Sequence, residues 1–372
     1  MRITAAVLHS PDDRYHLREL ELAAPGPGQI LVRIVATGYC HTDVLVRTPG
    51  FAPTPIITGH EGAGIVEAVG TGVDSPMVGD HVVLSYDACH ECTACTGGSP
   101  AYCDTFFPRN LGGTGLGEPG PVSASDGTSI AARWFGQSSF ATHTVVDARN
   151  AVVVARDLPL EMLAPLGCSV QTGAGSILIA LNVRAGTEVV IFGAGAVGLS
   201  AVMAARVAGA NTIVAVDLNP ARLALAREVG ATHAIDGAAT DLAAQIIRAT
   251  GGAHTCLDTT GVPAVITVAL EVLRATGTCG LVGAQHGDLV LAPATLAVGR
   301  TLTGILEGNA VPRVLIPRLI ELWRQGRFPF DKLVTTYAFE QINEAEEAAL
   351  RGAVIKPVLL MPDSEQPRPT RT

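Results

Sequence analysis

Four cysteines lie within one short stretch that contains Gly and Pro and has no hydrophobic periodicity: Cys89, Cys92, Cys95 and Cys103. Four thiolates at this spacing can close a tetrahedral zinc site with no open coordination position, so such a site would be structural. It would order a lobe that buries too little apolar surface to order itself. Disulfides and scattered free thiols are the alternatives. Disulfides are disfavoured because the spacings are tight and the N-terminal residues do not indicate a secretory signal.

A second set of possible metal ligands is dispersed along the chain. Cys40 follows a β-type run, His60 lies in the stretch GHEG, and Cys168 lies in LGCS. Two thiolates and one neutral imidazole neutralise Zn²⁺ and leave its fourth position free, as a catalytic zinc requires. Asp43 and Glu61 would orient His60 or tune the metal. The alternatives are a buried cysteine that acts as a small apolar residue, a histidine satisfied in the core, and carboxylates that cap loops.

A glycine-rich turn, GAGAVG at 193–198, follows the β-type run EVVIF and opens an apolar helical run. Gly193, Gly195 and Gly198 would permit the tight turn, the approach of the backbone to a diphosphate, and close packing of helix on strand. Asp217 ends the next β-type run, where a carboxylate accepts the ribose hydroxyls and repels a 2′-phosphate. The pattern favours NAD over NADP, although the nearby Arg222 could meet a phosphate instead. A glycine turn without any ligand is the alternative.

The chain contains regions with different hydrophobic patterns, and these regions must position the candidate residues. The first 165 or so residues contain short β-type runs broken by Gly and Pro, and the region to about 305 alternates six apolar runs with Ala-rich helical segments. Cys256 and Cys279 lie in two of those runs and are interpreted as core residues. The last part of the chain is expected to fold back onto the first region, with a mobile tail after Met361. We therefore predict an α/β protein with a β-rich domain (1–169 and 306–372) and a doubly wound parallel sheet (170–305).

Length and charge limit the possible functions. With 372 residues the chain is long enough for two domains of about 150 residues or more each. The net charge of −9 has the wrong sign for a protein that binds nucleic acid or acidic membranes by electrostatics. No run of 18 apolar residues suggests a membrane span. We expect a cytoplasmic protein with a small-molecule substrate and neither a nucleic-acid nor a membrane partner.

Five motifs together resemble the zinc-dependent medium-chain alcohol dehydrogenases over nearly the whole chain: GYCHTD, GHEGAGIVEAVG, the four-cysteine stretch, LGCSVQTGAG, and GAGAVG with Asp217. The stretch WFGQSSFATHTVVDARN is most similar to the aryl-alcohol (benzyl alcohol) branch, whose relatives also oxidise terpenoid and other primary allylic alcohols. The resemblance implies a GroES-like β-rich catalytic domain and a Rossmann domain. It implies a catalytic zinc on Cys40, His60 and Cys168, a structural zinc on the four-cysteine stretch, and bound NAD.

The resemblance also implies roles for residues beside the metal. Thr42 matches the family's hydroxyl that receives the substrate proton. Leu45 stands where well-known members end the proton relay with a histidine, so His41 or solvent would take over that role. His41 also matches a position whose basic residue contacts the cofactor diphosphate, and it could serve both purposes.

Further positions of the resemblance concern the cofactor and the substrate. Lys356 matches a basic diphosphate contact, with a surface lysine as the alternative, while Val197 and Val282 are assigned to the cofactor site. Leu45, Trp134 and Phe135 match pocket-lining positions and would suit a flat or branched apolar alcohol, although Trp134 could be core packing.

The long loop between the four-cysteine stretch and Trp134 resembles that of dimeric family members, so the resemblance implies a homodimer and not a tetramer. Three other functions stay open: a glutathione-dependent formaldehyde dehydrogenase, a zinc-free quinone or enoyl reductase on the same scaffold, and a protein that binds NAD without turnover.

Overall fold

The computed structural model describes residues 1–117 and 120–362 and divides the chain into two compact units, Met1–Cys168 with Leu333–Thr372, and Ser169–Lys332. Residues 306–332 therefore lie in the second unit and not in the first, where the sequence placed them. The reason is that α9 (Pro312–Arg324) packs against α4 (Ser169–Gly175). Most of the tail that the sequence predicts to be mobile, residues 363–372, lies outside the described residues.

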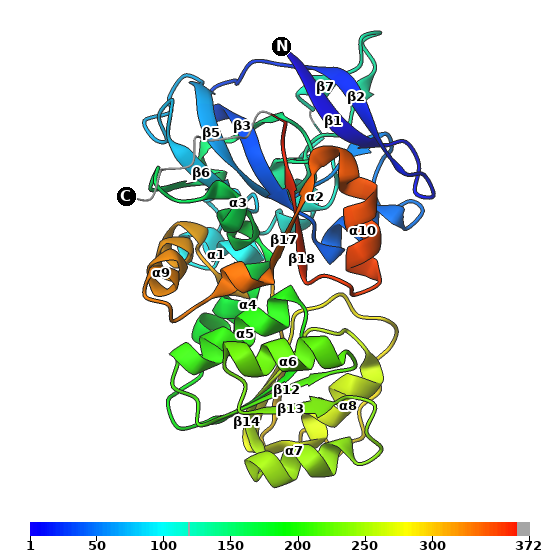
Figure 1. Cartoon of the computed structure of the whole chain (residues 1–372), viewed down its shortest axis with the longest axis vertical. Helices are drawn as coiled ribbons and strands as arrows, with labels where there is room; N and C mark the ends of the chain where they lie inside the picture. The colour runs from blue at the N-terminus through cyan, green and yellow to red at the C-terminus, as the bar shows by residue number, and fades with distance from the viewer. Residues whose placement is uncertain (118–119, 363–372) are drawn as a thin grey trace. The chain divides into compact units, whose positions relative to one another are not determined.

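The first unit is built from two β-sheets (Figure 1). The five-stranded sheet has the order β4-β1-β2-β7-β8, with β4 (Ile56–Ile57), β1 (Arg2–Leu8), β2 (Tyr15–Leu22), β7 (Val122–Ser123) and β8 (Ser129–Ile130). The larger sheet has the order β10-β6-β5-β3-β18-β17, with β10 (Ala151–Val154), β6 (His81–Leu84), β5 (Glu61–Val69), β3 (Gln29–Gly38), β18 (Lys356–Leu360) and β17 (Val334–Ala338), and β9 (His143–Asp147) also pairs with β3. The short helices of this unit are α1 (Thr93–Thr96), α2 (Phe106–Asn110), α3 (Leu160–Leu163) and α10 (Ile342–Leu350).

The strand β3 is the centre of the larger sheet and determines where two candidate ligands lie. It pairs antiparallel with β5 in a register that sets Gly38 opposite Glu61. Cys40 follows the end of β3 and His60 directly precedes β5, so the register brings the two residues together. A Cβ at Gly38 would lie 2.0 Å from the Glu61 Oε2 atom, so a side chain there would have to displace the buried Glu61 carboxylate.

The third candidate ligand, Cys168, is brought to the same place by a helical turn. It follows the 3₁₀ helix η5 (Ala164–Gly167), which packs on β3, β5 and β6. A Cβ at Gly167 would lie 2.1 Å from the Leu84 carbonyl oxygen. The turn can therefore approach β6 this closely only with glycine at that position.

The second unit is an all-parallel sheet of six strands in the order β13-β12-β11-β14-β15-β16 (Figure 1). Its strands are β11 (Glu188–Phe192), β12 (Thr212–Asp217), β13 (His233–Asp236), β14 (Ala253–Asp258), β15 (Leu273–Leu281) and β16 (Thr301–Gly304). The helices between the first five strands are α5 (Ala196–Val207), α6 (Pro220–Val229), α7 (Leu242–Thr250) and α8 (Pro263–Glu271). The strand order reverses between β11 and β14, and ligands of such sheets bind at the carboxyl ends of the strands beside that point.

Each of the six apolar runs singled out in the sequence forms one of these strands. Near-continuous apolar strands are expected where helices cover both faces of a parallel sheet. Cys256 and Cys279 lie side by side on β14 and β15, fully buried in the hydrophobic core. Burial raises the pKa of both thiols, so they remain neutral and unreactive, as expected for core residues.

No single helix among the described residues has the length and apolar composition that crossing a bilayer requires. One bent pair of helices, Leu160–Gly167 and Ser169–Ala180, passes that test on length and composition alone.

The packing of α5 on the glycine turn generates a stability prediction. A Cβ at Gly198 would lie 1.8 Å from the Gly193 carbonyl oxygen, whereas one at Gly195 meets nothing within 4 Å. Helix propensity alone would make Gly198→Ala stabilising by up to about 1 kcal/mol. We expect instead a loss of about 1–3 kcal/mol from overpacking, measured by calorimetry as a lower melting temperature.

Gly195→Ala is the matched control, because Gly195 is the N-cap of α5 and its replacement should cost at most about 1 kcal/mol. A Gly198→Ala protein that melts at or above the parent temperature would contradict this packing.

Candidate functional site

Cys40, His60 and Cys168 converge in the first unit. One ligand atom from each lies within 4.8 Å of the other two, although the three residues come from remote stretches of the chain. His60 is 1% exposed and Cys168 is 7% exposed. A donor set of two thiols and one imidazole that converges away from solvent suits Zn²⁺.

Asp43 holds two of these three residues. Its Oδ1 atom accepts hydrogen bonds from His60 Nδ1 at 2.9 Å, from the Gly59 amide at 3.0 Å and from Trp134 Nε1 at 2.9 Å. Its Oδ2 atom accepts from the Cys40 amide at 3.1 Å. Because the carboxylate accepts from Nδ1, Nε2 is the nitrogen that can bind a metal once its proton is lost. Nε2 is buried without a hydrogen bond in the part of the chain that the structure describes. A carboxylate behind a histidine is the arrangement that orients a metal-binding imidazole, so these residues fit a zinc ion.

The electrostatics of this cluster favour thiolate ligands. The hydrogen bond from Cys168, together with Lys356 and His60, holds the pKa of the Cys40 thiol well below its ordinary value. Burial alone would lower the pKa of His60, but Asp43 and Cys40 outweigh burial and raise it well above the usual value. The site is thus arranged to keep negative sulfur beside positive charge, and a metal dication can replace the protons.

A second buried charge pair lies behind the centre. Lys356 is 2% exposed, and its Nζ atom lies 3.0 Å from Oε1 and 2.9 Å from Oε2 of Glu61 and donates to the Tyr39 carbonyl oxygen at 2.9 Å. Burial would lower the pKa of Lys356, but Glu61 outweighs burial and raises it, so the ammonium stays charged. Glu61 follows His60 and Tyr39 precedes Cys40, so Lys356 ties the two ligand segments together. Its contact with a diphosphate stays a prediction.

The four-cysteine stretch forms a separate local cluster. Its four sulfur atoms lie within 4.8 Å of one another, and the Sγ atoms of Cys89 and Cys95 are 3.8 Å apart. That separation equals the edge of a tetrahedron with Zn–S bonds of about 2.3 Å, which is about 3.8 Å, and is far longer than a disulfide. All eight cysteines are free thiols. Backbone groups of Asp104 and Cys95 lower the pKa of Cys92 to about 6, and the Cys89 amide donates to Cys103 Sγ at 3.3 Å. The lobe therefore fits a structural zinc.

Two aromatic residues that match pocket-lining positions of the family, Trp134 and Phe135, lie beside the candidate metal ligands. The Phe135 ring stacks on the His60 imidazole, with centroids 4.4 Å apart. Its φ of 51° is a strained conformation for a residue with a side chain, costing about 1–3 kcal/mol, and persists only where the surroundings impose it. Trp134 is fully buried and donates its indole N–H to Asp43. The sequence carried no signal of this hydrogen bond, because its partners are far apart in the chain. Whether either residue also lines the pocket stays a prediction.

The candidate proton-relay residues lie on the 3₁₀ helix η1 (His41–Arg47), directly after Cys40. The Thr42 hydroxyl lies 3.8 Å from the Cys40 sulfur, and His41 is exposed to solvent. Leu45 is half-buried on the same helix. A hydroxyl next to a metal ligand and an exposed imidazole next to the hydroxyl could pass a proton outwards.

The dinucleotide motif lies at the carboxyl ends of the parallel strands in the second unit. Gly193 has a φ of 91°, which favours glycine, and the empty space beside Gly195 is the cradle that a Cβ would begin to fill. Asp217 ends β12, and its carboxylate accepts from the Ala194 amide at 2.6 Å and from the Asn219 amide at 2.8 Å. A carboxylate has further lone pairs for ribose hydroxyls. These residues therefore fit a dinucleotide.

The remaining predicted cofactor residues occupy the same end of the sheet. Arg222 is half-buried in the first turn of α6, Val197 lies in the first turn of α5, and Val282 directly follows β15. Their contacts with a cofactor stay predictions.

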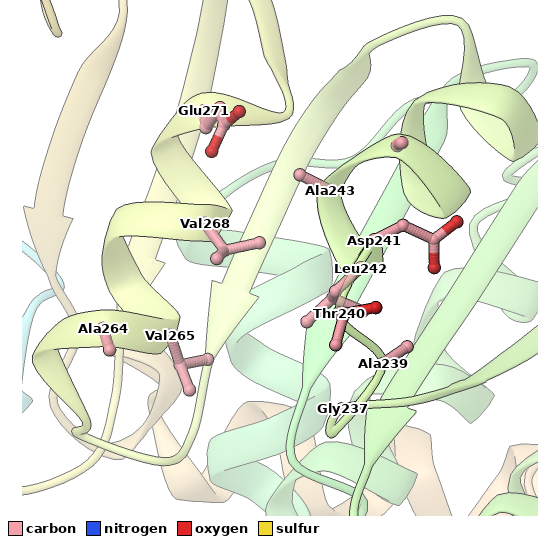
Figure 2. Close-up of a pocket in the computed structure, with 11 residues that line it drawn as sticks. Gly237, Ala239, Thr240, Asp241, Leu242, Ala243, Ala264, Val265, Val268 and Glu271 are labelled. Atoms are coloured by element: carbon pink, nitrogen blue, oxygen red, sulfur yellow. The ribbon is translucent and has the colours of Figure 1, made fainter.

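A surface pocket of the second unit lies elsewhere. Figure 2 shows that it is lined by the turn before α7 and the start of that helix, including Thr240 and Leu242, and by α8, including Val265 and Val268. None of the site residues predicted from the sequence lines it.

Comparisons with known proteins agree with this geometry. Residues 26–156 match the family of alcohol dehydrogenase GroES-like domains, and residues 196–323 match the zinc-binding dehydrogenases. With the parallel sheet of the second unit, the first match confirms the predicted fold class, a GroES-like β-rich domain and a Rossmann domain.

Three relatives are similar over nearly their full length. Geraniol dehydrogenase from Castellaniella defragrans is 45% identical over 96% of this chain and 97% of its own. The crystal structure of an alcohol dehydrogenase zinc-binding domain protein from Burkholderia ambifaria is 45% identical with a TM-score of 0.95, covering 97% of this chain and 99% of that one. The crystal structure of benzyl alcohol dehydrogenase from Acinetobacter calcoaceticus is 41% identical with a TM-score of 0.91 and the same coverage.

The hydrogen bonds of Asp43 lead to a prediction about the zinc affinity of the dispersed centre. Asp43→Ala leaves His60 Nδ1, the Trp134 indole and two amides without their acceptor, so the imidazole is no longer held. We expect metal affinity at this centre to fall about 10- to 100-fold, measured as zinc per chain after dialysis against a graded chelator.

The four-cysteine cluster is the internal control, since Asp43 contacts none of its residues. Parent-like zinc content after the same dialysis would refute the role given to Asp43.

Proposed function

This chain belongs to the zinc-dependent medium-chain alcohol dehydrogenases, and from that membership we propose that it oxidises a primary aryl or allylic (terpenoid) alcohol to the aldehyde, with hydride transfer to NAD. The observation that carries the proposal is the convergence of Cys40, His60 and Cys168, with a histidine nitrogen left without a hydrogen bond. Three protein ligands leave one coordination position for the substrate oxygen. The four-cysteine cluster would hold the second zinc of each chain.

The residues around the centre divide the chemistry between them. Bound on Cys40, His60 and Cys168, Zn²⁺ would supply Lewis acidity and lower the pKa of the alcohol. Asp43 keeps His60 in the tautomer that presents Nε2. Thr42 accepts the hydroxyl proton, and His41 or water carries it to solvent. The alcohol and NAD⁺ thereby become the aldehyde, NADH and a proton.

The proposed substrate class is supported by the names of two relatives, geraniol and benzyl alcohol dehydrogenase. Both alcohols are primary, with an sp² carbon next to the carbon that bears the hydroxyl. The aromatic side chains Trp134 and Phe135 beside the metal ligands agree with an apolar, flat substrate. A glutathione-dependent formaldehyde dehydrogenase is the closer rival, and rates with and without glutathione separate the two. A zinc-free reductase does not require metal ligands, so the convergence of Cys40, His60 and Cys168 argues against that alternative.

The homodimer proposal is supported by the free edge of the parallel sheet. The strand β16 is the last strand of that sheet among the described residues, and an edge strand presents unpaired backbone N–H and C=O groups with which a second chain could pair.

The activity test measures kcat/KM with NAD for benzyl, cinnamyl, geranyl and short linear alcohols. We expect aryl and allylic alcohols to exceed the linear ones by at least about tenfold, because apolar contacts typically discriminate by this factor. Cys40→Ala should abolish turnover and leave NAD binding unchanged. A preference for linear alcohols would refute the substrate class, and an active Cys40→Ala enzyme would refute the metal mechanism.

The cofactor preference predicts a second variant. Asp217→Ser removes the carboxylate that repels a 2′-phosphate, so the ratio of kcat/KM for NAD to that for NADP should fall at least about tenfold. Asp236→Ser is a matched control, because Asp236 lies opposite Asp217 in the register of the neighbouring strand β13. Equal ratios in the two variants would contradict the role of Asp217.

A further inference from the structure

Two buried polar side chains near the metal centre have no role in the chemistry described so far. Gln137 and Ser85 are both 0% exposed. Burying an amide or a hydroxyl costs free energy unless hydrogen bonds compensate for the lost water. The partners of these two side chains therefore indicate what they do.

Gln137 binds the backbone on both sides of the first residue of β5. Its Oε1 atom accepts from the Gly62 amide at 3.1 Å, and its Nε2 atom donates to the His60 carbonyl oxygen at 3.0 Å. The Gly62 amide can only donate and the His60 carbonyl can only accept, so the orientation of the Gln137 amide is determined. The peptide that carries the ligand His60 is thus held from one side by a single amide group.

Ser85 continues this bridge to the third ligand. The same Nε2 atom of Gln137 also donates to the Ser85 carbonyl oxygen at 3.3 Å. The Ser85 hydroxyl donates to the Gly167 carbonyl oxygen at 2.7 Å, and Gly167 directly precedes Cys168. A continuous chain of hydrogen bonds therefore joins the backbone at His60 to the backbone at Cys168.

We propose that Gln137 and Ser85 are positioning residues that set the spacing between the metal ligands His60 and Cys168. Asp43 and Lys356 link the segments of Cys40 and His60, and this bridge adds a hydrogen-bonded link from the His60 segment to the Cys168 segment. Metal sites require their ligands within about 0.5 Å of the productive geometry, and a loosened bridge would weaken that constraint. The inference rests on the proposed zinc centre and deepens it.

The structure offers a control for mere stability. Ser139 is also 0% exposed and lies two residues after Gln137, and its hydroxyl is hydrogen-bonded to the Thr37 hydroxyl at 2.8 Å. The side-chain oxygens of this pair do not bond to the backbone of a metal ligand. Ser139→Ala thus removes a buried hydrogen bond close to the bridge without cutting it.

The experiment uses the full-length, zinc-loaded protein. Variants Gln137→Leu, Ser85→Ala, Ser85→Thr and Ser139→Ala are compared by the rate at which each class of zinc passes to a coloured chelator. The visible spectrum of the cobalt-substituted protein and the melting temperature are also recorded. Ser85→Ala carries the test if Gln137→Leu does not fold.

The expected result separates positioning from stability. Gln137→Leu and Ser85→Ala should release one zinc equivalent at least about tenfold faster than the parent, with a changed cobalt spectrum, while the second equivalent is unaffected. Ser85→Thr keeps the hydroxyl and should restore the parent rate. Ser139→Ala should lower the melting temperature and leave both release rates unchanged.

Two results would overturn the inference without touching the proposed function. One is parent-like zinc release from Gln137→Leu and Ser85→Ala, and the other is equally fast release from Ser139→Ala. A parent protein that holds zinc only in the four-cysteine cluster would overturn the proposed function and this inference together.

Discussion

The antiparallel pairing of β3 with β5 is the constraint on which the dispersed metal centre depends. It sets Gly38 opposite Glu61, so the residues beyond the two strand ends, Cys40 and His60, meet without any local sequence relation. Side chains alternate along a strand, so a slip of one residue would turn Glu61 to the opposite face of the sheet. The buried contact with Lys356 would be lost with it. Gly38 permits this register, since a side chain at that position would displace the buried Glu61 carboxylate.

Buried charged side chains surround the dispersed centre, and each has a partner that compensates for its burial. Asp43 and Glu61 are fully buried carboxylates, and each is compensated within the first unit, by the His60 and Trp134 N–H groups or by Lys356. Removing one partner of such a pair leaves a buried charge uncompensated, which typically costs about 3–5 kcal/mol. The hydrogen bonds therefore act together, and they hold thiolate sulfur beside positive charge before any metal arrives. A zinc ion held by these ligands would therefore couple metal binding to the folding of this unit.

The sequence predicted what local patterns encode. Six apolar runs indicated six strands, and motif spacing indicated the four-cysteine set and the glycine turn with Asp217. Residue types alone left Cys40, His60 and Cys168 as possible ligands, and the family resemblance implied that they form one set. The sequence assigned residues 306–332 to the first unit, whereas they belong to the second. The packing of α9 on α4 is a tertiary contact, and hydrophobic periodicity does not show which unit a helix packs on. The hydrogen bond from the Trp134 indole to Asp43 and the bridge made by Gln137 could not be predicted for the same reason. Each joins residues that are remote in sequence, and the sequence does not distinguish a buried polar residue in a loop from an exposed one. Lys356 had the sequence context of a surface lysine at a strand, yet it is buried.

The two candidate zinc sites of the first unit differ in how much chain must be closed to bring their ligands together. Consecutive ligands of the four-cysteine cluster are at most eight residues apart, whereas His60 and Cys168 are separated by 108 residues. Loop-closure entropy grows as the logarithm of length, so the longer closure costs roughly 2 kcal/mol more than closing the Cys95–Cys103 loop. The local cluster can gather its ligands with little help from the rest of the fold. The dispersed centre cannot, and its ligands stay together only while β3, β5 and η5 are packed. Zinc bound at the dispersed centre would therefore report on the tertiary structure of this unit, whereas zinc bound at the cysteine cluster would report on a single loop.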